Sequence, residues 1–142
     1  LSAAAAGRKV FAAFWSDDPG AALMHGPTYM ANPLACAAAN ASLDLFEDGA
    51  WQGEVARIAA GLEHGLGPCR SARGVTDVRV RGAVGVVEMD APVDAGVLTR
   101  RFAAEGVWIR PMGKVIYLTP PFIIDDDDLN RLTGAVAQVL RA

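Results

Sequence analysis

The most informative stretch of this chain reads His25-Gly26-Pro27-Thr28-Tyr29-Met30-Ala31-Asn32-Pro33-Leu34-Ala35-Cys36. Asparagine is a favoured N-cap and proline is pre-set for the first helical position, so Asn32 and Pro33 predict the start of a helix. Upstream, Gly26 and Pro27 predict a tight turn that exposes the hydroxyl and the backbone N–H of Thr28. Exposed donors beside a helix start suit a bound anion such as phosphate. For a lone Gly-Pro-Thr, an ordinary capping loop would be the favoured interpretation.

The complete stretch changes that interpretation, because it resembles the segment that class III, fold-type I aminotransferases extend across their dimer to the pyridoxal phosphate (PLP) of the partner subunit. Two other segments agree with that family in order and spacing, Asp77–Glu88 and Gly106–Pro121. The resemblance stays in register over nearly all 142 residues, but it covers only the C-terminal part of the family. It implies an α/β fold class, with residues 1–48 as the C-terminal end of the large PLP-binding domain and residues 49–142 as the C-terminal small α/β domain.

The form of the stretch narrows the resemblance within the class. Most members carry Ser or Thr where this chain has Pro27, and Gly-Gly where it has Met30 and Ala31. The form found here resembles the branch that moves the amino group of S-adenosylmethionine to 8-amino-7-oxononanoate, giving 7,8-diaminononanoate in biotin biosynthesis. That resemblance implies a homodimer in which Pro27 and Thr28 contact the PLP phosphate of the other subunit and the backbone of Gly26 contacts substrate.

Arg110 is the sharpest single-residue candidate. The sequence predicts a short strand over Val107–Arg110, and Pro111 restricts Arg110 to extended geometry. A guanidinium fixed at a strand end offers a planar fork that can bind a carboxylate bidentately. From the residue alone, a plain surface ion pair is the favoured interpretation. Within Gly106–Pro111, the resemblance implies that Arg110 binds the carboxylate of the oxo-acid substrate.

The resemblance also implies what this stretch of sequence lacks. The reactive Schiff-base lysine of the family is expected just before residue 1, and no catalytic residue is expected within the chain. The lysines present, Lys9 and Lys114, lack the glycine-flanked setting of that residue and are expected to serve at the surface. PLP supplies the electron-sink chemistry and the protein supplies the lysine and ring partners. The chain alone is therefore expected to be inactive.

Composition excludes several other classes of protein. The net charge of −3 argues against nucleic-acid binding, and no apolar run reaches the ~18 residues of a membrane span. Leu1–Ala6 is apolar but lacks a basic leader, so we do not expect it to be a signal peptide. We expect the protein to be a cytoplasmic enzyme. Cys36 and Cys69 are expected to be small buried apolar residues rather than a disulfide. The Asp125–Asp128 run lacks Ca²⁺-loop spacing and is read as a helix start, so no metal site is predicted.

Periodicity predicts alternating helices and strands. Strands are expected at Leu1–Ala6, Asp77–Arg81, Val84–Met89, Val107–Arg110 and Val115–Leu118, and helices at Arg8–Trp15, from Asn32 to about Phe46, from about Ala50 to Cys69, and at Asp94–Ala104 and Asp125–Leu140. Tyr29 and Trp108 are expected to be packing residues, with a weaker claim on the substrate pocket, and Tyr117 to anchor a strand to the core. Two alternatives stay open: a free-standing α/β binding or interaction module, and a part of another class III aminotransferase.

Overall fold

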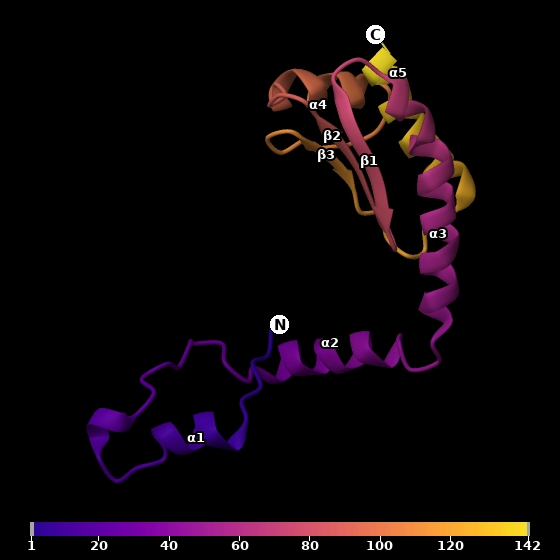
Figure 1. Cartoon of the computed structure of the whole chain (residues 1–142). Helices are drawn as coiled ribbons and strands as arrows, with labels where there is room; N and C mark the ends of the chain where they lie inside the picture. Colours follow the sequence, from indigo (N-terminus) through magenta and orange to yellow (C-terminus); the bar gives the residue numbers. More distant parts are fainter. Residues whose placement is uncertain (1, 142) are drawn as a thin grey trace. The chain divides into compact units, whose positions relative to one another are not determined.

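The computed structural model describes residues 2–141, and the chain divides into two units, Leu1–Asp48 and Gly49–Ala142 (Figure 1). Gly49 at the division has a φ of +72°, a left-handed conformation that glycine adopts without the steric cost other residues meet. That turn leads directly into the first helix of the second unit. The assignment of these units to the large and small domains of an aminotransferase stays a prediction.

The first unit contains two short helices and a single 3₁₀ turn joined by irregular backbone. They are α1 (Arg8–Phe14), η1 (Pro19–Ala21) and α2 (Pro33–Asp44). The Oδ1 atom of Asn32 accepts a hydrogen bond from the N–H of Ala35 at 3.1 Å, which confirms the predicted N-cap of α2. No described residue of this unit is buried; Leu34 on α2 and Leu45, the C-cap of that helix, are 82% and 76% exposed. The apolar stripe predicted for this helix is therefore not covered by the described residues of the unit.

The strand predicted at Leu1–Ala6 is wrong for the described residues 2–6. These residues have no regular secondary structure and their side chains are exposed. A strand requires a neighbouring strand for its backbone hydrogen bonds, and the pairings of the three described strands all lie within the second unit. Leu1 itself lies outside the described residues.

The second unit is a three-stranded antiparallel sheet with helices packed on it (Figure 1). Its elements are α3 (Ala50–Leu66), η2 (Gly67–Ser71), β1 (Val75–Arg81), β2 (Val84–Met89), α4 (Ala95–Ala104), β3 (Val115–Leu118) and α5 (Asp126–Arg141). The strand order is β1-β2-β3, and a tight turn at Gly82, with a φ of +54°, joins the first pair. The mixture of helices and a small sheet confirms the α/β class. The helices α3, α4 and α5 and the strands β1, β2 and β3 lie where the sequence predicts them, which confirms most of the predicted elements.

Alternation along the sheet separates an apolar face from a solvated one. Val78 and its partner Val87 are 2% and 1% exposed on the helix-covered face. On the other face, Arg79 donates hydrogen bonds to the carboxylates of Asp77 and Glu88 at 2.7 and 2.6 Å. The bond from Arg79 holds the pKa of Asp77 below its usual value. The core is completed by residues of all three helices and β3: Ile58, Leu62, Leu66, Phe102, Ile116, Leu129 and Val136.

Helices α3 and α5 approach closely because glycine lies at their contact. A Cβ atom at Gly65 would come within 2.1 Å of the hydroxyl oxygen of Thr133, and one at Gly61 within 2.4 Å of a methyl carbon of Leu129. The sequence suggests only that these glycines weaken the helix, whereas the structure gives them a packing role. Gly67 and Pro68 do end α3 before the predicted Cys69, as their types favour.

The strand predicted at Val107–Arg110 is also wrong, because its backbone bonds to α4 instead of to a strand. The N–H of Val107 donates to the carbonyl oxygen of Phe102 at 3.1 Å. The carbonyl oxygen of Ile109 accepts from the hydroxyl of Thr99 at 3.2 Å. This segment therefore runs beside α4 as anchored, irregular backbone.

Candidate functional site

The loop before α2 exposes the donors of Thr28. Two successive turns shape it, with the N–H of Met30 bonded to the carbonyl of Pro27 at 2.9 Å and that of Asn32 to the carbonyl of Tyr29 at 3.2 Å. Ala31 has a φ of +53°, so the second turn holds a non-glycine residue in the left-handed region. Thr28 is exposed, and within residues 2–141 neither its hydroxyl nor its N–H has a hydrogen-bond partner.

Arg110 lies on an anchored backbone with its side chain in solvent. Its neighbours Ile109 and Pro111 are buried, which fixes the segment to the core of the second unit. Among the described residues, Arg110 forms no ion pair and no hydrogen bond through its guanidinium. A planar cation that is held in place and left unpaired is suited to bind a carboxylate.

Two hollows flank Arg110. The larger, of about 410 Å³, lies between the Arg110 segment and the residues from Tyr117 to Pro121, and we call it the Tyr117 hollow. The smaller, of about 320 Å³, lies against the start of α4 at Ala95 and Gly96, and we call it the α4 hollow. Arg110 and Trp108 line both of them. Of the predicted site residues, Gly26, Pro27 and Thr28 thus share one loop of the first unit, and Arg110 belongs to the second.

Three aromatic residues lie differently from the expectation. Trp108 and Tyr29 are 76% and 78% exposed, so neither is a packing residue within its unit. Tyr117 is 38% exposed and pairs with Val86 on the solvated face of the sheet, so it does not anchor β3. Ile116 and Leu118 anchor β3 instead, at 1% and 4% exposure. The sequence does contain a signal for this arrangement. Side chains alternate between the two faces of a strand, so Tyr117 lies on the other face of the sheet from its apolar neighbours Ile116 and Leu118.

The lysine and cysteine side chains lie in surroundings that indicate structural or surface roles. The ammonium group of Lys114 donates to the carbonyl oxygen of Asp90 at 2.6 Å and so braces a turn, while Lys9 lies exposed on α1. Both arrangements fit the surface roles expected for these lysines. Cys69 is buried as predicted, and burial raises the pKa of its thiol, whereas Cys36 is only partly buried. Neither cysteine forms a disulfide.

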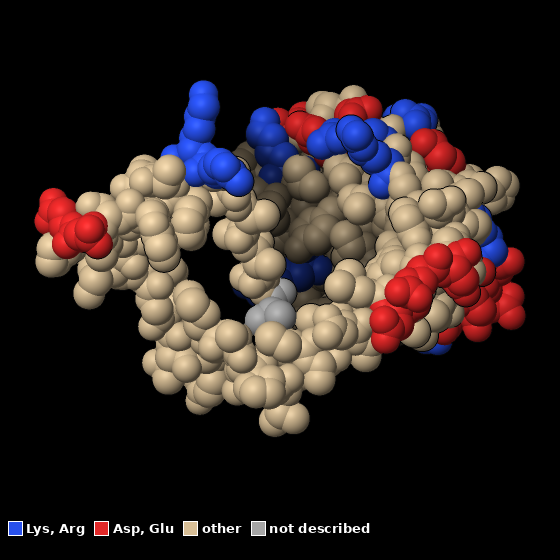
Figure 2. Space-filling model, turned by 90° about the horizontal axis from the view of Figure 1, so that it is seen from below, with Lys and Arg blue, Asp and Glu red and all other residues tan. Residues whose placement is uncertain are grey.

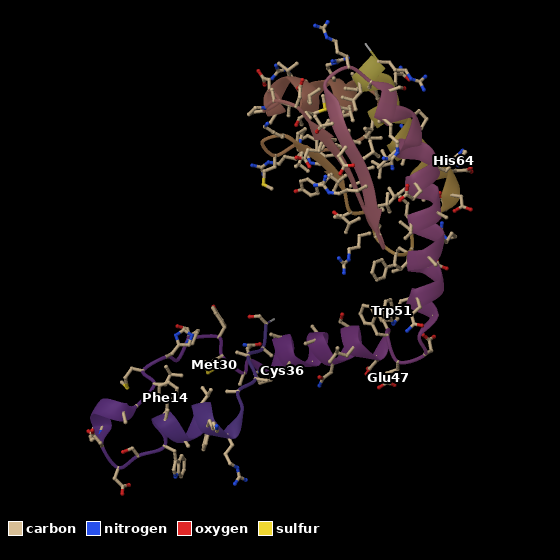
Figure 3. All side chains as sticks on the ribbon, viewed as in Figure 1. Phe14, Met30, Cys36, Glu47, Trp51 and His64 are labelled. Atoms are coloured by element: carbon tan, nitrogen blue, oxygen red, sulfur yellow. The ribbon has the colours of Figure 1, made fainter. Side chains whose placement is uncertain are left out.

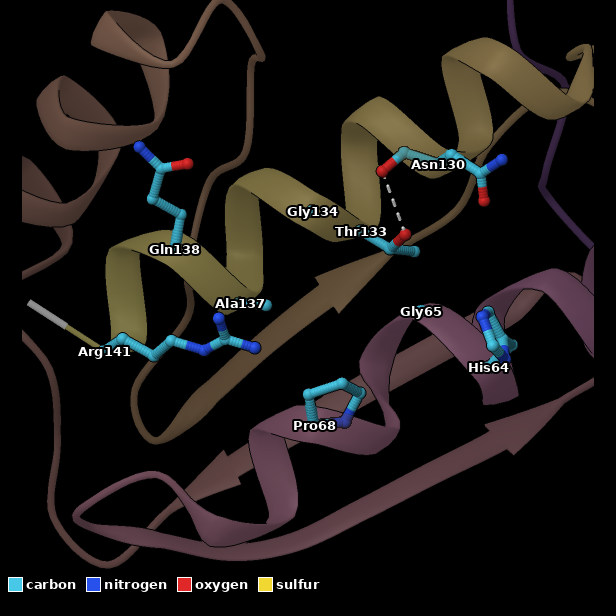
Figure 4. Close-up of a pocket in the computed structure, with 9 residues that line it drawn as sticks. All are labelled: His64, Gly65, Pro68, Asn130, Thr133, Gly134, Ala137, Gln138 and Arg141. Atoms are coloured by element: carbon cyan, nitrogen blue, oxygen red, sulfur yellow. Dashed lines mark hydrogen bonds between the residues drawn. The ribbon is translucent and has the colours of Figure 1, made fainter.

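A third hollow, of about 670 Å³, is a groove between α3 and α5 and lies apart from Arg110 (Figure 4). Its buried polar group, the hydroxyl of Thr133, already donates to the backbone oxygens of Leu129 and Asn130. His64 at its rim is exposed and projects from the side of α3 away from the sheet (Figure 3). Because its one buried polar group is satisfied within the fold, this groove gives no evidence of a ligand.

The acidic run that begins the last helix has a local explanation. The carboxylate of Asp125 accepts a hydrogen bond from the N–H of Asp128 at 2.8 Å, so Asp125 caps α5. Asp126, Asp127 and Asp128 form the first turn of α5, so the run does lie at the helix start, as predicted. Among residues 2–141, no group of three or more His, Cys, Asp and Glu side chains is placed to hold a metal ion. Of the helices formed by the described residues, none has the length and apolar character needed to cross a membrane.

Comparison with known proteins identifies relatives along almost the whole chain. The sequence model of class-III aminotransferases matches residues 1–140. Adenosylmethionine-8-amino-7-oxononanoate aminotransferase of Corynebacterium glutamicum is 49% identical over 117 residues, which are 82% of this chain and 28% of that protein. The enzyme of the same name from Mycobacterium leprae is 45% identical over 83% of this chain and 27% of its own length. The chain thus spans under three tenths of the length of these two curated relatives.

Solved structures give the same relationship. The adenosylmethionine-8-amino-7-oxononanoate aminotransferase of Methanocaldococcus jannaschii superposes with a TM-score of 0.74 at 27% identity, covering 85% of this chain and 30% of that one. A PLP-bound amine transaminase from an uncultivated Pseudomonas species gives 0.71 at 29% identity, over 83% of this chain and 29% of its own. The chain is therefore a member of the class III aminotransferase family.

Proposed function

We propose that this chain is part of a PLP-dependent aminotransferase that moves the amino group of S-adenosylmethionine to 8-amino-7-oxononanoate in biotin biosynthesis. The 49% identity with the C. glutamicum enzyme of that name supports this assignment over other members of the class. The single structural observation that carries it is Arg110, an anchored and unpaired guanidinium on the edge of an otherwise uncharged hollow. In this proposal Arg110 binds the carboxylate of the oxo acid.

The loop at Gly26–Thr28 fits a contact with the cofactor. A phosphate accepts hydrogen bonds, and Thr28 offers a hydroxyl and an N–H that have no partner among the described residues. Pro27 has no N–H and shapes the turn through its carbonyl, which accepts from Met30. In this proposal Thr28 holds the PLP phosphate, and the backbone of Gly26 contacts substrate. When bound, PLP supplies the electron sink for amino transfer.

The proposal includes a homodimer in which the Thr28 loop serves the cofactor of the partner subunit. The exposed apolar side chains of the first unit support it, since large apolar surfaces mark interfaces. In the space-filling view, most of the visible surface carries neither cationic nor anionic side chains (Figure 2). The side chains concerned in the first unit are Phe11, Trp15, Leu23, Met24, Tyr29, Leu34 and Leu45.

A second candidate reaction deserves a direct comparison, because the omega-amino acid–pyruvate aminotransferase of Pseudomonas putida is 35% identical over 82% of this chain. The test uses the full-length enzyme that carries this sequence, loaded with PLP. Diaminononanoate is measured with S-adenosylmethionine and 8-amino-7-oxononanoate, and alanine is measured with an omega-amino acid and pyruvate. The proposal requires turnover of the first pair to exceed that of the second. Turnover of the second pair alone would reassign the chain within its class.

A further inference from the structure

Trp108 is a large apolar side chain left in solvent on a fixed backbone. It is 76% exposed, although Ile109 beside it is 3% exposed and packs in the core. Hydrogen bonds on both sides of it, from the N–H of Val107 and to the carbonyl of Ile109, tie its backbone to α4. An exposed indole contributes little burial to the stability of this unit, so its position calls for a contact outside the unit's own core.

Trp108 and Arg110 project to the same side of the segment. Both side chains are exposed and line the Tyr117 hollow and the α4 hollow. Ile109 between them is 3% exposed, packs in the core and lines only the Tyr117 hollow. A cation and a broad apolar surface are therefore presented two residues apart on one rim. That combination complements a ligand with a carboxylate at the end of an apolar chain.

The Tyr117 hollow is the better receptacle for such a chain. It is the larger of the two hollows, at about 410 Å³ against about 320 Å³. Arg110 is the one charged side chain in its lining, and Trp108 and Tyr117 provide aromatic surface with Pro120 and Pro121 beside them. A single cation at the rim of an apolar hollow fixes the orientation of a ligand, carboxylate at Arg110 and chain inward.

We propose that Trp108 is a specificity-determining residue, which binds the aliphatic chain of the same substrate whose carboxylate Arg110 binds. This inference rests on the proposed function, and it adds the residue that makes the site select for chain length. A short carboxylate satisfies Arg110 alone. A long one also buries methylene groups between the indole of Trp108 and the phenol of Tyr117, and each fully buried methylene strengthens binding by about fourfold.

The test measures binding without turnover, by calorimetry on the full-length enzyme with propionate, hexanoate and nonanoate. The wild-type enzyme should bind them with affinity that rises along the series. Trp108→Ala should flatten this dependence and leave propionate binding little changed, and Trp108→Phe should retain part of it. Arg110→Ala should weaken all three ligands and keep the dependence on length. Ile123→Ala, a control at a side chain 92% exposed that lines neither hollow, should change nothing.

Two results would overturn the inference. One is a dependence on chain length that is absent in the wild-type enzyme or unchanged in Trp108→Ala. The other is an equal loss of all three ligands in Trp108→Ala, which would make the indole a structural support for Arg110. Failure of the proposed function is a separate observation, because it appears as a lack of amino transfer from S-adenosylmethionine to 8-amino-7-oxononanoate in the wild-type enzyme.

Discussion

At the scale of single residues, Thr28 is notable for donors that the fold leaves unused. Thr28 is exposed on a loop with two turns, which are closed by hydrogen bonds from the N–H groups of Met30 and Asn32. The second of these turns holds Ala31 at a φ of +53°, a conformation that costs a non-glycine residue about 1 kcal/mol or more. A loop held in this shape keeps Thr28 in a fixed position before the N-cap of α2.

Replacing Thr28 by Val in the full-length enzyme tests this role. The substitution preserves the approximate volume and removes one donor to a charged phosphate, which should cost about 1.5–3 kcal/mol of PLP affinity. Equilibrium dialysis against PLP measures the loss, and excess PLP should restore activity. Thr28→Ser keeps the hydroxyl and serves as the matched control. Equal PLP affinity in the Val and wild-type enzymes would return Thr28 to an ordinary loop role.

The two cysteines should differ in reactivity. Cys69 is 1% exposed and burial raises the pKa of its thiol, while Cys36 is partly accessible on α2. Because the thiolate is the reactive form, a raised pKa and burial both protect Cys69. In the 142-residue chain, a thiol reagent should label Cys36 quickly and Cys69 only after denaturant is added. Mass spectrometry of peptides assigns the sites, and rapid labelling of both in native buffer would contradict the placement of Cys69 in the core.

At the scale of elements, α3 and α5 depend on the glycine at their contact. Gly65→Ala should raise the intrinsic helix propensity of α3 by about 1 kcal/mol, yet its Cβ would meet Thr133, which is β-branched and bonded to its own helix. We expect the clash to outweigh the gain and destabilise a protein of residues 49–142 by about 1–3 kcal/mol. Urea unfolding measures the change.

Gly53→Ala is the matched control for that substitution. It lies on the same helix, and no atom comes within 4 Å of the added Cβ, so it should stabilise the same protein through helix propensity alone. Thr133→Ala should recover part of the loss caused by Gly65→Ala. Two alanine variants of equal stability would contradict the close approach of the helices.

The elements also show where sequence reasoning reaches its limit. Periodicity located α3, β1, β2 and α5, because their apolar residues recur at helical or strand spacing and face one core. The pattern at Val107–Arg110 also predicted a strand. In the structure, however, the N–H of Val107 donates to the carbonyl of Phe102, and the carbonyl of Ile109 accepts from the hydroxyl of Thr99. A pattern of side chains cannot show which of two neighbours will satisfy a backbone N–H.

Prediction of the candidate site from the sequence has the same limit. Arg110 and Thr28 are candidates because the stretches around them resemble class III aminotransferases, whereas either residue taken alone favours an ordinary surface or loop role. The structure exposes both. Trp108 and Tyr117 were expected to pack, because large aromatic residues most often do. Their exposure follows from the path of the segment beside α4 and from the solvated face of the sheet, which are properties of the tertiary structure.

At the scale of the whole chain, the two units should differ in their ability to fold alone. Every buried residue among positions 2–141 belongs to the second unit, while the first unit exposes large apolar side chains. A protein of residues 49–142 should therefore unfold cooperatively and elute as a monomer. The chain of 142 residues should associate through its first unit, since exposed apolar patches promote association. Size-exclusion chromatography with light scattering compares the two, and a monomeric 142-residue chain with a cooperative melt would contradict this and favour an independent module.

The most direct test of the proposed reaction is a single-turnover measurement on full-length enzyme carrying Arg110→Ala. If Arg110 binds the carboxylate of 8-amino-7-oxononanoate, its loss should slow the half-reaction in which that acid receives the amino group, by the rate equivalent of about 2–5 kcal/mol. The half-reaction in which S-adenosylmethionine gives up its amino group should change little. Arg110→Lys should recover only part of the loss, because a point charge lacks the bidentate fork. Equal slowing of both half-reactions, or of neither, would contradict the assignment of Arg110 and of the oxo acid it is proposed to bind.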